Sequence, residues 1–457
     1  MLKLFQAVDM TEGRPAAKIA AFTIPMIIGN VAQQLYSTVD SVIVGRFVGD
    51  NALAAVGSAS PVLNLLYVLF IGISTGAGIL VAQYFGAKER ERLSKAICCC
   101  ITTTLAAVII IMCVSPLVIR PLLVLMKTPD SIINWCQSYL MITFMGIIGS
   151  AYYNILGGIL RGLGDSVSAL VYLLVATVIN IVLDYTFVAK FGMGVAGVAL
   201  ATVIAQCISA ALSLRKLYTM KDVFDMKKRY FWPEAQYTKR LISLGLPSGV
   251  TQAIFSMSML IVQSLTNSFG EMFIAANVIV MRIDGFVMMP AFSFGNAMTT
   301  YTGQNVGAAR MDRVKQGAKE GTFLAMCVSA VLTALILLFG KYIMAIFTTT
   351  QELIELSYHL MSIIAFGYIL MEITQCLQGV MRGAGDTMTP MWISIFSSVL
   401  FRIPITYGLV YMSRTAENPV GNCDLMYVSM LICWTLSCLM TAFMYLRGGW
   451  KKKAVLQ

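Results

Sequence analysis

Charged side chains are scarce in this chain. Lysine, arginine, aspartate and glutamate together make up 12% of its 457 residues, whereas soluble domains carry about 25%. Hydrophobic residues reach 58%. This balance excludes an ordinary soluble protein and indicates a protein that lies in a membrane.

Histidine is rarer still, and His359 is the single one in the sequence. The eleven cysteines lie mostly inside apolar runs, and their spacing fits no metal site. The segment GMGVAG (192–197) fits the glycine pattern of dinucleotide-binding loops, but it joins two apolar runs and follows no strand. A membrane enzyme would need a catalytic set, and none of these patterns offers one. The sequence therefore predicts a protein that is not an enzyme and holds no cofactor.

Long apolar runs recur along the whole chain, and twelve of them are long enough to cross about 30 Å of hydrocarbon. Because a bilayer offers no water to the backbone, each run is predicted to be a helix. The predicted spans are 19–42, 53–82, 96–119, 132–159, 166–189, 194–214, 241–267, 273–302, 320–340, 353–380, 388–412 and 424–446. The N-terminal segment has no apolar core and no small-residue cleavage site, so no removable signal is expected. The expected fold is an all-α polytopic membrane protein.

The net charge of +11 is distributed unevenly about these spans. With the N-terminus on the inner side, 25 lysines and arginines fall inside and six fall outside. The outer six are Arg46, Arg120, Lys127, Lys190, Lys341 and Arg414. This asymmetry follows the positive-inside rule and predicts that both termini are cytoplasmic. Topology thus explains the basic excess, and nucleic acid is not expected as a partner.

The chain contains an internal duplication. Residues 158–166 read GILRGLGDS and residues 379–387 read GVMRGAGDT, a shift of 221 positions. Each motif follows an even-numbered span, so the halves share one orientation and form a parallel repeat of six plus six helices. We therefore expect an N-lobe over 1–214, a basic cytoplasmic linker over 215–240 and a C-lobe over 241–457. The glycines of the two motifs indicate tight turns.

Polar residues gather in the spans of the first half. Asn180 and Asp184 are four apart and share a helix face, and no basic residue lies between Arg161 and Lys190. Other polar residues of these spans are Asn30, Gln33, Gln34, Ser37, Asp40, Asn154, Thr202 and Gln206. A lone polar residue in a membrane helix usually joins helices, but two carboxylates with amides and a hydroxyl favour an ion site. Sodium would use the oxygen atoms and a proton would use a carboxyl group, so the sequence leaves both ions open.

The second half differs in its polar content. Shifted by 221 positions, Asp184 corresponds to Ile405 and Asn180 to Phe401. The second half instead has charges of both signs inside its spans, where they could pair: Arg282, Asp284, Glu372 and Arg402. It also holds 20 of the 30 methionines, which are flexible side chains that suit promiscuous apolar binding surfaces. The residues predicted to line a substrate cavity are Met257, Met288, Met289, Arg282, Asp284 and Glu372.

The segment GNVAQQLYSTVDSVIVGRFVG (29–49), the RGLGDS and RGAGDT turns and the six-plus-six layout resemble the multidrug and toxic compound extrusion (MATE) family. The similarity is greatest to its bacterial DinF-like branch. The resemblance implies two lobes in the bacterial cytoplasmic membrane and ion-driven antiport of organic cations and other amphipathic compounds by alternating access. It also implies an N-lobe cation site, for sodium or a proton, whose pattern is matched by Asp40, Asn180, Asp184 and Thr202. The second-half acids of other branches are matched only loosely, with Glu372 best placed.

Two other functional classes compete with this interpretation. A lipid-linked precursor flippase or polymer exporter of the same wider superfamily would present cations to a phosphate head, and Arg282 and Arg402 keep that alternative open. A receptor or scaffold would not explain unpaired acids in the spans. The expected partners are the lipid bilayer and small amphipathic or cationic substrates. A monomer is expected because each chain already contains both lobes.

Overall fold

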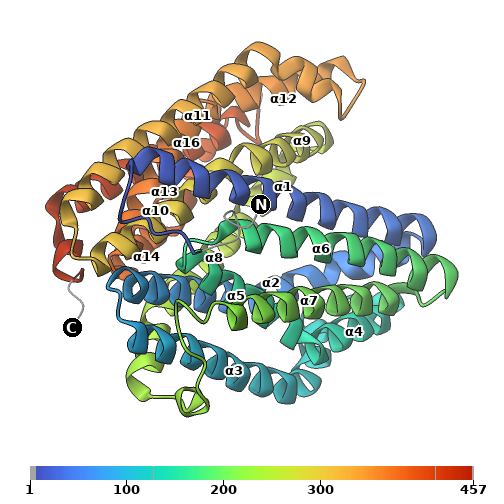
Figure 1. The fold of residues 1–457 in the computed structure, drawn as a ribbon. Coiled ribbons are helices and arrows are strands. Elements are labelled where there is room, and N and C mark those ends of the chain that lie inside the picture. The colour runs from blue at the N-terminus through green and yellow to red at the C-terminus, as the bar shows by residue number, and fades with distance from the viewer. Residues whose placement is uncertain (1–6, 127, 417, 455–457) are drawn as a thin grey trace. The chain divides into compact units, whose positions relative to one another are not determined.

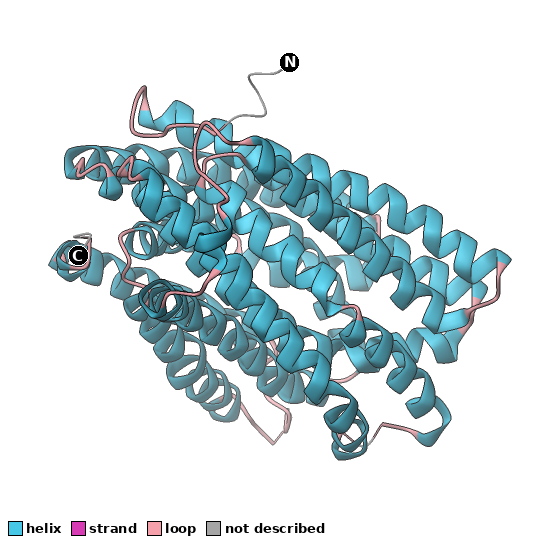
Figure 2. Cartoon of the chain, turned by 60° about the horizontal axis from the view of Figure 1, so that its bottom comes forward, coloured by secondary structure: helices cyan, strands magenta, loops and turns pink. Residues whose placement is uncertain are grey.

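The computed structural model describes residues 7–126, 128–416 and 418–454, and every regular element in this part is helical (Figures 1 and 2). In the first half the α-helices are α1 (Pro15–Phe47), α2 (Asp50–Gly86), α3 (Arg90–Leu125), α4 (Asp130–Met145), α5 (Ile147–Gly162), α6 (Ser166–Asp184) and α7 (Gly194–Thr219). In the second half they are α8 (Ala235–Thr266), α9 (Glu271–Val287), α10 (Met289–Gly307), α11 (Met311–Ala345), α12 (Gln351–Ile364), α13 (Gly367–Gly383), α14 (Met388–Ile395), α15 (Arg402–Met412) and α16 (Asp424–Arg447). Lys127, one of the six predicted outer charges, lies outside the described residues.

The twelve predicted spans agree with these helices. Ten helical stretches are long and apolar enough to cross a membrane, and two bent helix pairs bring the number to twelve if each pair is one span. The prediction of an all-α polytopic membrane protein built from a repeat is therefore confirmed.

Two of the spans are bent at equivalent places in the repeat. The chain bends by 51° at the break between α4 and α5, and by 45° at the break between α12 and α13. Gly146 and Gly367, which are 221 positions apart, lie at these two breaks. A Cβ atom on Gly367 would come within 2.6 Å of Trp434 Cε3, and one on Gly146 would come within 2.9 Å of Val203 Cβ. Both bends thus occur where a neighbouring helix leaves no room for a side chain.

The chain forms two compact units. The first comprises Met1–Asp9 and Ile24–Gly249, and the second comprises Met10–Thr23 and Val250–Gln457. One division lies between Asp9 and Met10, and the other two fall inside helices α1 and α8, close to the internal prolines Pro25 and Pro247. The units differ from the predicted lobes in the segment 10–23 and in the position of the second boundary. The lobes as functional parts stay a prediction.

Hydrogen bonds explain why the segment 10–23 belongs to the second unit. Met10, which is 1% exposed, donates its backbone N–H to Gln304 Oε1 at 2.8 Å. The guanidinium of Arg310 donates to the Thr11 carbonyl at 2.8 Å. The segment therefore packs as part of the second unit although it precedes the first unit in sequence.

Within the range predicted as a linker, 215–240, α7 continues to Thr219 and α8 begins at Ala235. Between them, the Arg90 guanidinium donates to both carboxylate oxygens of Asp225, at 3.0 and 3.2 Å. This hydrogen bond lowers the pKa of Asp225. The linker is thus held on the first unit by polar contacts.

The two RG-x-GD motifs form the tight turns that their glycines indicate. Gly164 and Gly385 have φ values of 83° and 95°, a region that residues with a Cβ atom rarely adopt. Asp165 and Asp386 each cap the next helix by accepting a backbone N–H three residues along, at 2.8 and 3.2 Å. Burial raises the pKa of Asp165, which the hydrogen bonds of Ser168 partly oppose. Both motifs therefore shape the backbone at a helix end.

Glycines also permit close helix crossings inside each unit. A Cβ atom on Gly158 of α5 would come within 2.5 Å of the Ser74 carbonyl oxygen of α2. At the equivalent crossing, one on Gly379 of α13 would come within 3.0 Å of Met298 Cβ of α10. Small residues at such crossings let backbones approach, which is a main source of helix association in membranes.

Gly158→Ala is expected to lower the stability of the purified protein by about 1–3 kcal/mol, because the added methyl group overpacks the crossing of α2 and α5. Gly57→Ala is the matched control, since Gly57 is also helical and has nothing within 4 Å of its Cβ position. Alanine is intrinsically the better helix former, so the control should be neutral or stabilising. Thermal unfolding in detergent measures both variants, and equal midpoints would contradict the assignment of this crossing.

Candidate functional site

A polar cluster in the first unit unites residues from three helices. Helix α1 contributes Asp40, α6 contributes Asn180 and Asp184, and α7 contributes Thr202. Asn180 and Asp184 are 0% exposed, as their shared helix face turns into the unit. Directly after Asp184 the helix widens into a π-helical segment, Tyr185–Lys190. Such π segments are frequent at functional sites.

The side-chain amide of Asn180 bridges the two acids. In the orientation that satisfies its neighbours, its nitrogen donates to Asp40 Oδ1 at 2.8 Å and to Asp184 Oδ2 at 3.0 Å. The amide's other end faces Thr202 Oγ1 at 3.4 Å. The four residues that the family pattern singles out are thus neighbours in space.

The two carboxyl groups lie close together, because both accept from the same Asn180 nitrogen. Asp40 and Asp184 lie within side-chain hydrogen-bonding range of one another. A hydrogen bond between two carboxyl groups requires a proton on one of them, because two carboxylates are acceptors only. Asp184 Oδ1 is buried and has no hydrogen-bond partner. In the described part of the chain, no lysine, arginine or histidine forms an ion pair with either acid.

Two tyrosines that the sequence reasoning missed adjoin the cluster. Tyr36 donates its hydroxyl to Thr202 Oγ1 at 3.2 Å. Tyr139 of α4 lies close enough to interact electrostatically with both carboxyl groups. The position of Tyr36 four residues before Asp40 was a usable signal, because it places both side chains on one helix face. No spacing in the sequence indicated Tyr139.

The other polar residues predicted to support the site differ in exposure and in their partners. Gln33, Gln34 and Ser37 are exposed, and Ser37 Oγ donates to the Gln33 carbonyl of its own helix at 3.2 Å. Asn30 is half-buried. No hydrogen bond given for the described residues joins Gln33, Gln34 or Ser37 to the acid pair.

Asn154 and Gln206 belong to a second polar cluster centred on Ser150 of α5. Asn154 donates its amide to the Ser150 carbonyl at 2.8 Å, and Ser150 Oγ donates to Gln206 Oε1. The backbone carbonyl of Asn154 accepts from Ser74 Oγ at 2.6 Å. This cluster ties α2, α5 and α7 together, which is the usual work of lone polar residues in membrane helices.

The predicted substrate-cavity residues of the second half divide by exposure. Met257 is 60% exposed, whereas Met288 and Met289 are 6% and 8% exposed and lie in the interior of the second unit. Arg282 is exposed. Glu372 is 2% exposed, and its Oε2 has no hydrogen-bond partner.

The charges of the second half do not pair as the sequence suggested they could. Among the described residues, no ion pair within 4 Å joins the acids Asp284 and Glu372 to Arg282 or Arg402. Asp284 instead accepts a hydrogen bond from the Tyr368 hydroxyl at 2.9 Å. The Tyr368 hydroxyl thus binds this acid directly, and Arg402 acts on it electrostatically from beyond ion-pair distance.

The first-unit cluster has the chemistry of a site for a hard cation or a proton. Its donors are carboxylate, amide and hydroxyl oxygens, which hard cations prefer. A transition-metal site would require three or more His, Cys, Asp or Glu side chains close together. No such group is found within the described residues. A net negative cluster with one unpartnered oxygen can accept one positive charge and release it again.

The fold and this cluster define a class: a polytopic membrane transporter built from a duplicated helical repeat. The MatE family model matches residues 25–186 and 247–408, once in each half, so the chain belongs to the MATE family. It is 30% identical over 457 residues to the probable multidrug resistance protein YoeA of Bacillus subtilis (strain 168), covering 98% of this chain and 97% of that protein. It is 25% identical to the probable multidrug resistance protein NorM of Thermotoga maritima, covering 96% and 94%.

Solved structures share the fold. A crystal structure of MATE in complex with MaL6 superposes with a TM-score of 0.90 at 22% identity, covering 98% of this chain and 99% of that chain. A transporter of the MOP superfamily from Pyrococcus furiosus superposes with a TM-score of 0.88 at 22% identity and the same coverage. At this level of identity the likeness establishes the architecture alone.

Proposed function

We propose that this protein is a secondary antiporter that exports organic cations and amphipathic compounds in exchange for Na⁺ or H⁺ by alternating access. The observation that carries the proposal is an acid pair, the half-buried Asp40 and the fully buried Asp184, bridged by Asn180 and with no basic partner among the described residues. The names of its relatives, which call them multidrug resistance proteins, support an export function.

The energetics of the pair explain why it would couple to an ion. A charged carboxylate at mid-bilayer costs about 2.5–3.5 kcal/mol even on the lenient insertion scale. A captured cation or proton offsets this cost, and its loss restores the cost. The site therefore has two states of different energy, and occupancy can bias the transporter between two conformations. Coupling then requires only that ion and substrate prefer different conformations.

The direct test reconstitutes the protein in vesicles and follows a fluorescent organic cation under an imposed Na⁺ or pH gradient. We expect accumulation against the cation's own gradient with one of the two ions. The alternative function, a flippase for lipid-linked precursors, retains one motivation: Arg402 lies within a span and its guanidinium contacts the sulfur of Met430, at 3.9 Å. Movement of a labelled lipid phosphate without ion-driven cation transport would favour that alternative.

We further propose that both termini are cytoplasmic and that the protein acts as a monomer in the bacterial plasma membrane. Reporter fusions after Met193 and after Lys228 should read outside and inside respectively, because the charge asymmetry places these loops on opposite sides. The same side for both reporters would contradict the topology.

A further inference from the structure

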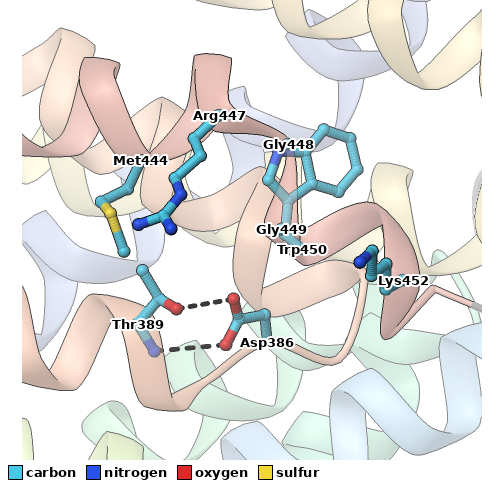
Figure 3. Close-up of a pocket in the computed structure, with 8 residues that line it drawn as sticks. All are labelled: Asp386, Thr389, Met444, Arg447, Gly448, Gly449, Trp450 and Lys452. Atoms are coloured by element: carbon cyan, nitrogen blue, oxygen red, sulfur yellow. Dashed lines mark hydrogen bonds between the residues drawn. The ribbon is translucent and has the colours of Figure 1, made fainter.

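A cavity of about 330 Å³ opens at the end of α16, on the second unit (Figure 3). It is lined by Asp386 and Thr389 from the RG-x-GD turn and α14, by Met444 and Arg447 from α16, and by the residues that follow it, including Trp450 and Lys452. Trp450 is 1% exposed and donates its indole N–H to the Tyr445 carbonyl at 3.0 Å. The cavity therefore has a fixed aromatic wall and is distinct from the acid cluster of the first unit.

Two basic side chains in the lining of this cavity have no acidic partner among the described residues. Asp386 is fully engaged: its Oδ1 accepts from Lys453 at 2.8 Å and from the Thr389 N–H at 3.2 Å, and its Oδ2 accepts from the Thr389 hydroxyl at 2.7 Å. Lys453 thus neutralises the only acid in the lining. Arg447 and Lys452 have no hydrogen bond or ion pair with any described residue. Among the residues that the structure describes, no acid compensates the positive charges of Arg447 and Lys452 in this cavity.

The corresponding turn of the first half provides a contrast. There the cap Asp165 also has a lysine partner, Lys216, at 4.0 Å. That lysine lies on α7 itself, whereas Lys453 follows the end of α16. A partner for the cap is therefore common to both halves. The additional Arg447 and Lys452 are not needed for that role.

Apolar side chains flank the cavity along the membrane-spanning helices. Phe443 of α16, four residues before Arg447, is 64% exposed, and Trp392 of α14, three residues after Thr389, is 51% exposed. Both helices belong to candidate spans, so these surfaces lie at the depth of acyl chains, while the cavity lies at a helix end, where lipid headgroups are found. A ligand with a phosphate and two fatty chains would place its phosphate in the cavity and its chains along the apolar side chains.

We propose that this cavity binds the phosphate of an anionic phospholipid through Arg447 and Lys452. Basic pockets at the ends of membrane helices suit anionic headgroups, and the arginine fork matches phosphate geometry. The positive choline group of phosphatidylcholine would be repelled by the Arg447 guanidinium. The expected lipid is therefore phosphatidylglycerol, whose headgroup carries no positive charge. A water-soluble phosphate ester shares the recognised group, and the test separates the two sources.

The test measures lipid retention by native mass spectrometry after incubation with equal amounts of phosphatidylglycerol and phosphatidylcholine of the same chain length. The full-length wild type should retain phosphatidylglycerol preferentially. Arg447→Gln combined with Lys452→Gln should weaken retention on the order of tenfold, since each basic residue near a membrane surface contributes a severalfold preference. Lys228→Gln combined with Lys239→Gln, two exposed lysines of the first unit, is the matched control and should retain the lipid as the wild type does.

A second variant keeps the charges and tests the cavity itself. Met444→Trp fills the cavity and should also reduce phosphatidylglycerol retention, and thermal unfolding checks that each variant is folded. Competition with glycerol 3-phosphate distinguishes the sources: displacement of the lipid indicates a site for soluble phosphate esters, and retention indicates a site for lipid. Equal retention by the wild type and the Arg447 and Lys452 double variant, or an equal loss in the Lys228 and Lys239 control, would overturn the proposal.

Discussion

Asp184→Asn is expected to abolish ion-driven export while the protein still folds and inserts. The substitution keeps the size of the side chain and its hydrogen bonding with Asn180, but it removes the group that gains and loses a positive charge. Coupling requires that the bound ion favour one conformation, so without a group that captures the ion the gradient-driven rate should fall to background. Asp40→Asn should have the same effect, because the two carboxyl groups share one site.

Thr38→Val is the matched control for this prediction. Thr38 is exposed on the same helix as Asp40, and its hydroxyl donates to the Gln34 carbonyl of its own helix at 2.9 Å. Export of a fluorescent cation from vesicles should be unchanged in this variant. Substrate binding in detergent should survive at least partly in Asp184→Asn. Wild-type export rates in both acid variants would identify the pair as an ordinary contact between helices.

The second large effect is expected at the methionines of the second half. Met288 lies in a buried cluster with Ile283, Tyr368 and other apolar residues, so Met288→Ala should lower stability by about 2–5 kcal/mol. Met257 is 60% exposed, and Met257→Ala should leave stability within about 0.5 kcal/mol. If Met257 contacts substrate, as the sequence predicts, its variant should instead change the spectrum of exported compounds.

Thermal unfolding and drug-resistance profiles together separate these two outcomes. A destabilised Met257 variant, or a Met288 variant with wild-type stability and an altered substrate spectrum, would reverse the assignment of the two residues. Met289, which is 8% exposed, should behave like Met288.

Much of the architecture was predictable because membrane helices leave strong local signals. The twelve spans follow from apolar length alone, and the RG-x-GD turns follow from glycine spacing. The bends at Gly146 and Gly367 were not predicted, because a glycine within a helix marks a bend only when the neighbouring helix is known. The packing of Met10 with Gln304 was equally inaccessible, since it joins residues 294 positions apart.

The sequence predicted the two acids of the candidate site, but it predicted the polar residues around them less well. The four-residue step from Asn180 to Asp184 fixes a shared helix face, whatever the tertiary structure. Gln206 also follows Thr202 by four residues, yet its amide oxygen accepts from Ser150, because a side chain of that length can turn to a different neighbour. Periodicity thus gives the face of a helix but not the partner of a long polar side chain.

The measurement that tests the central claim most directly is proton release by the purified protein in weakly buffered detergent solution near pH 7. We propose that Asp40 and Asp184, which the Asn180 amide bridges, share one proton, so adding Na⁺ or a transported organic cation should displace it. We expect an indicator dye to record this release in the wild type, with whichever of the two ligands competes for the site, and to record none in Asp184→Asn. Equal release by both proteins, or no release from the wild type with either ligand, would contradict the assignment of this pair as the ion-coupling site.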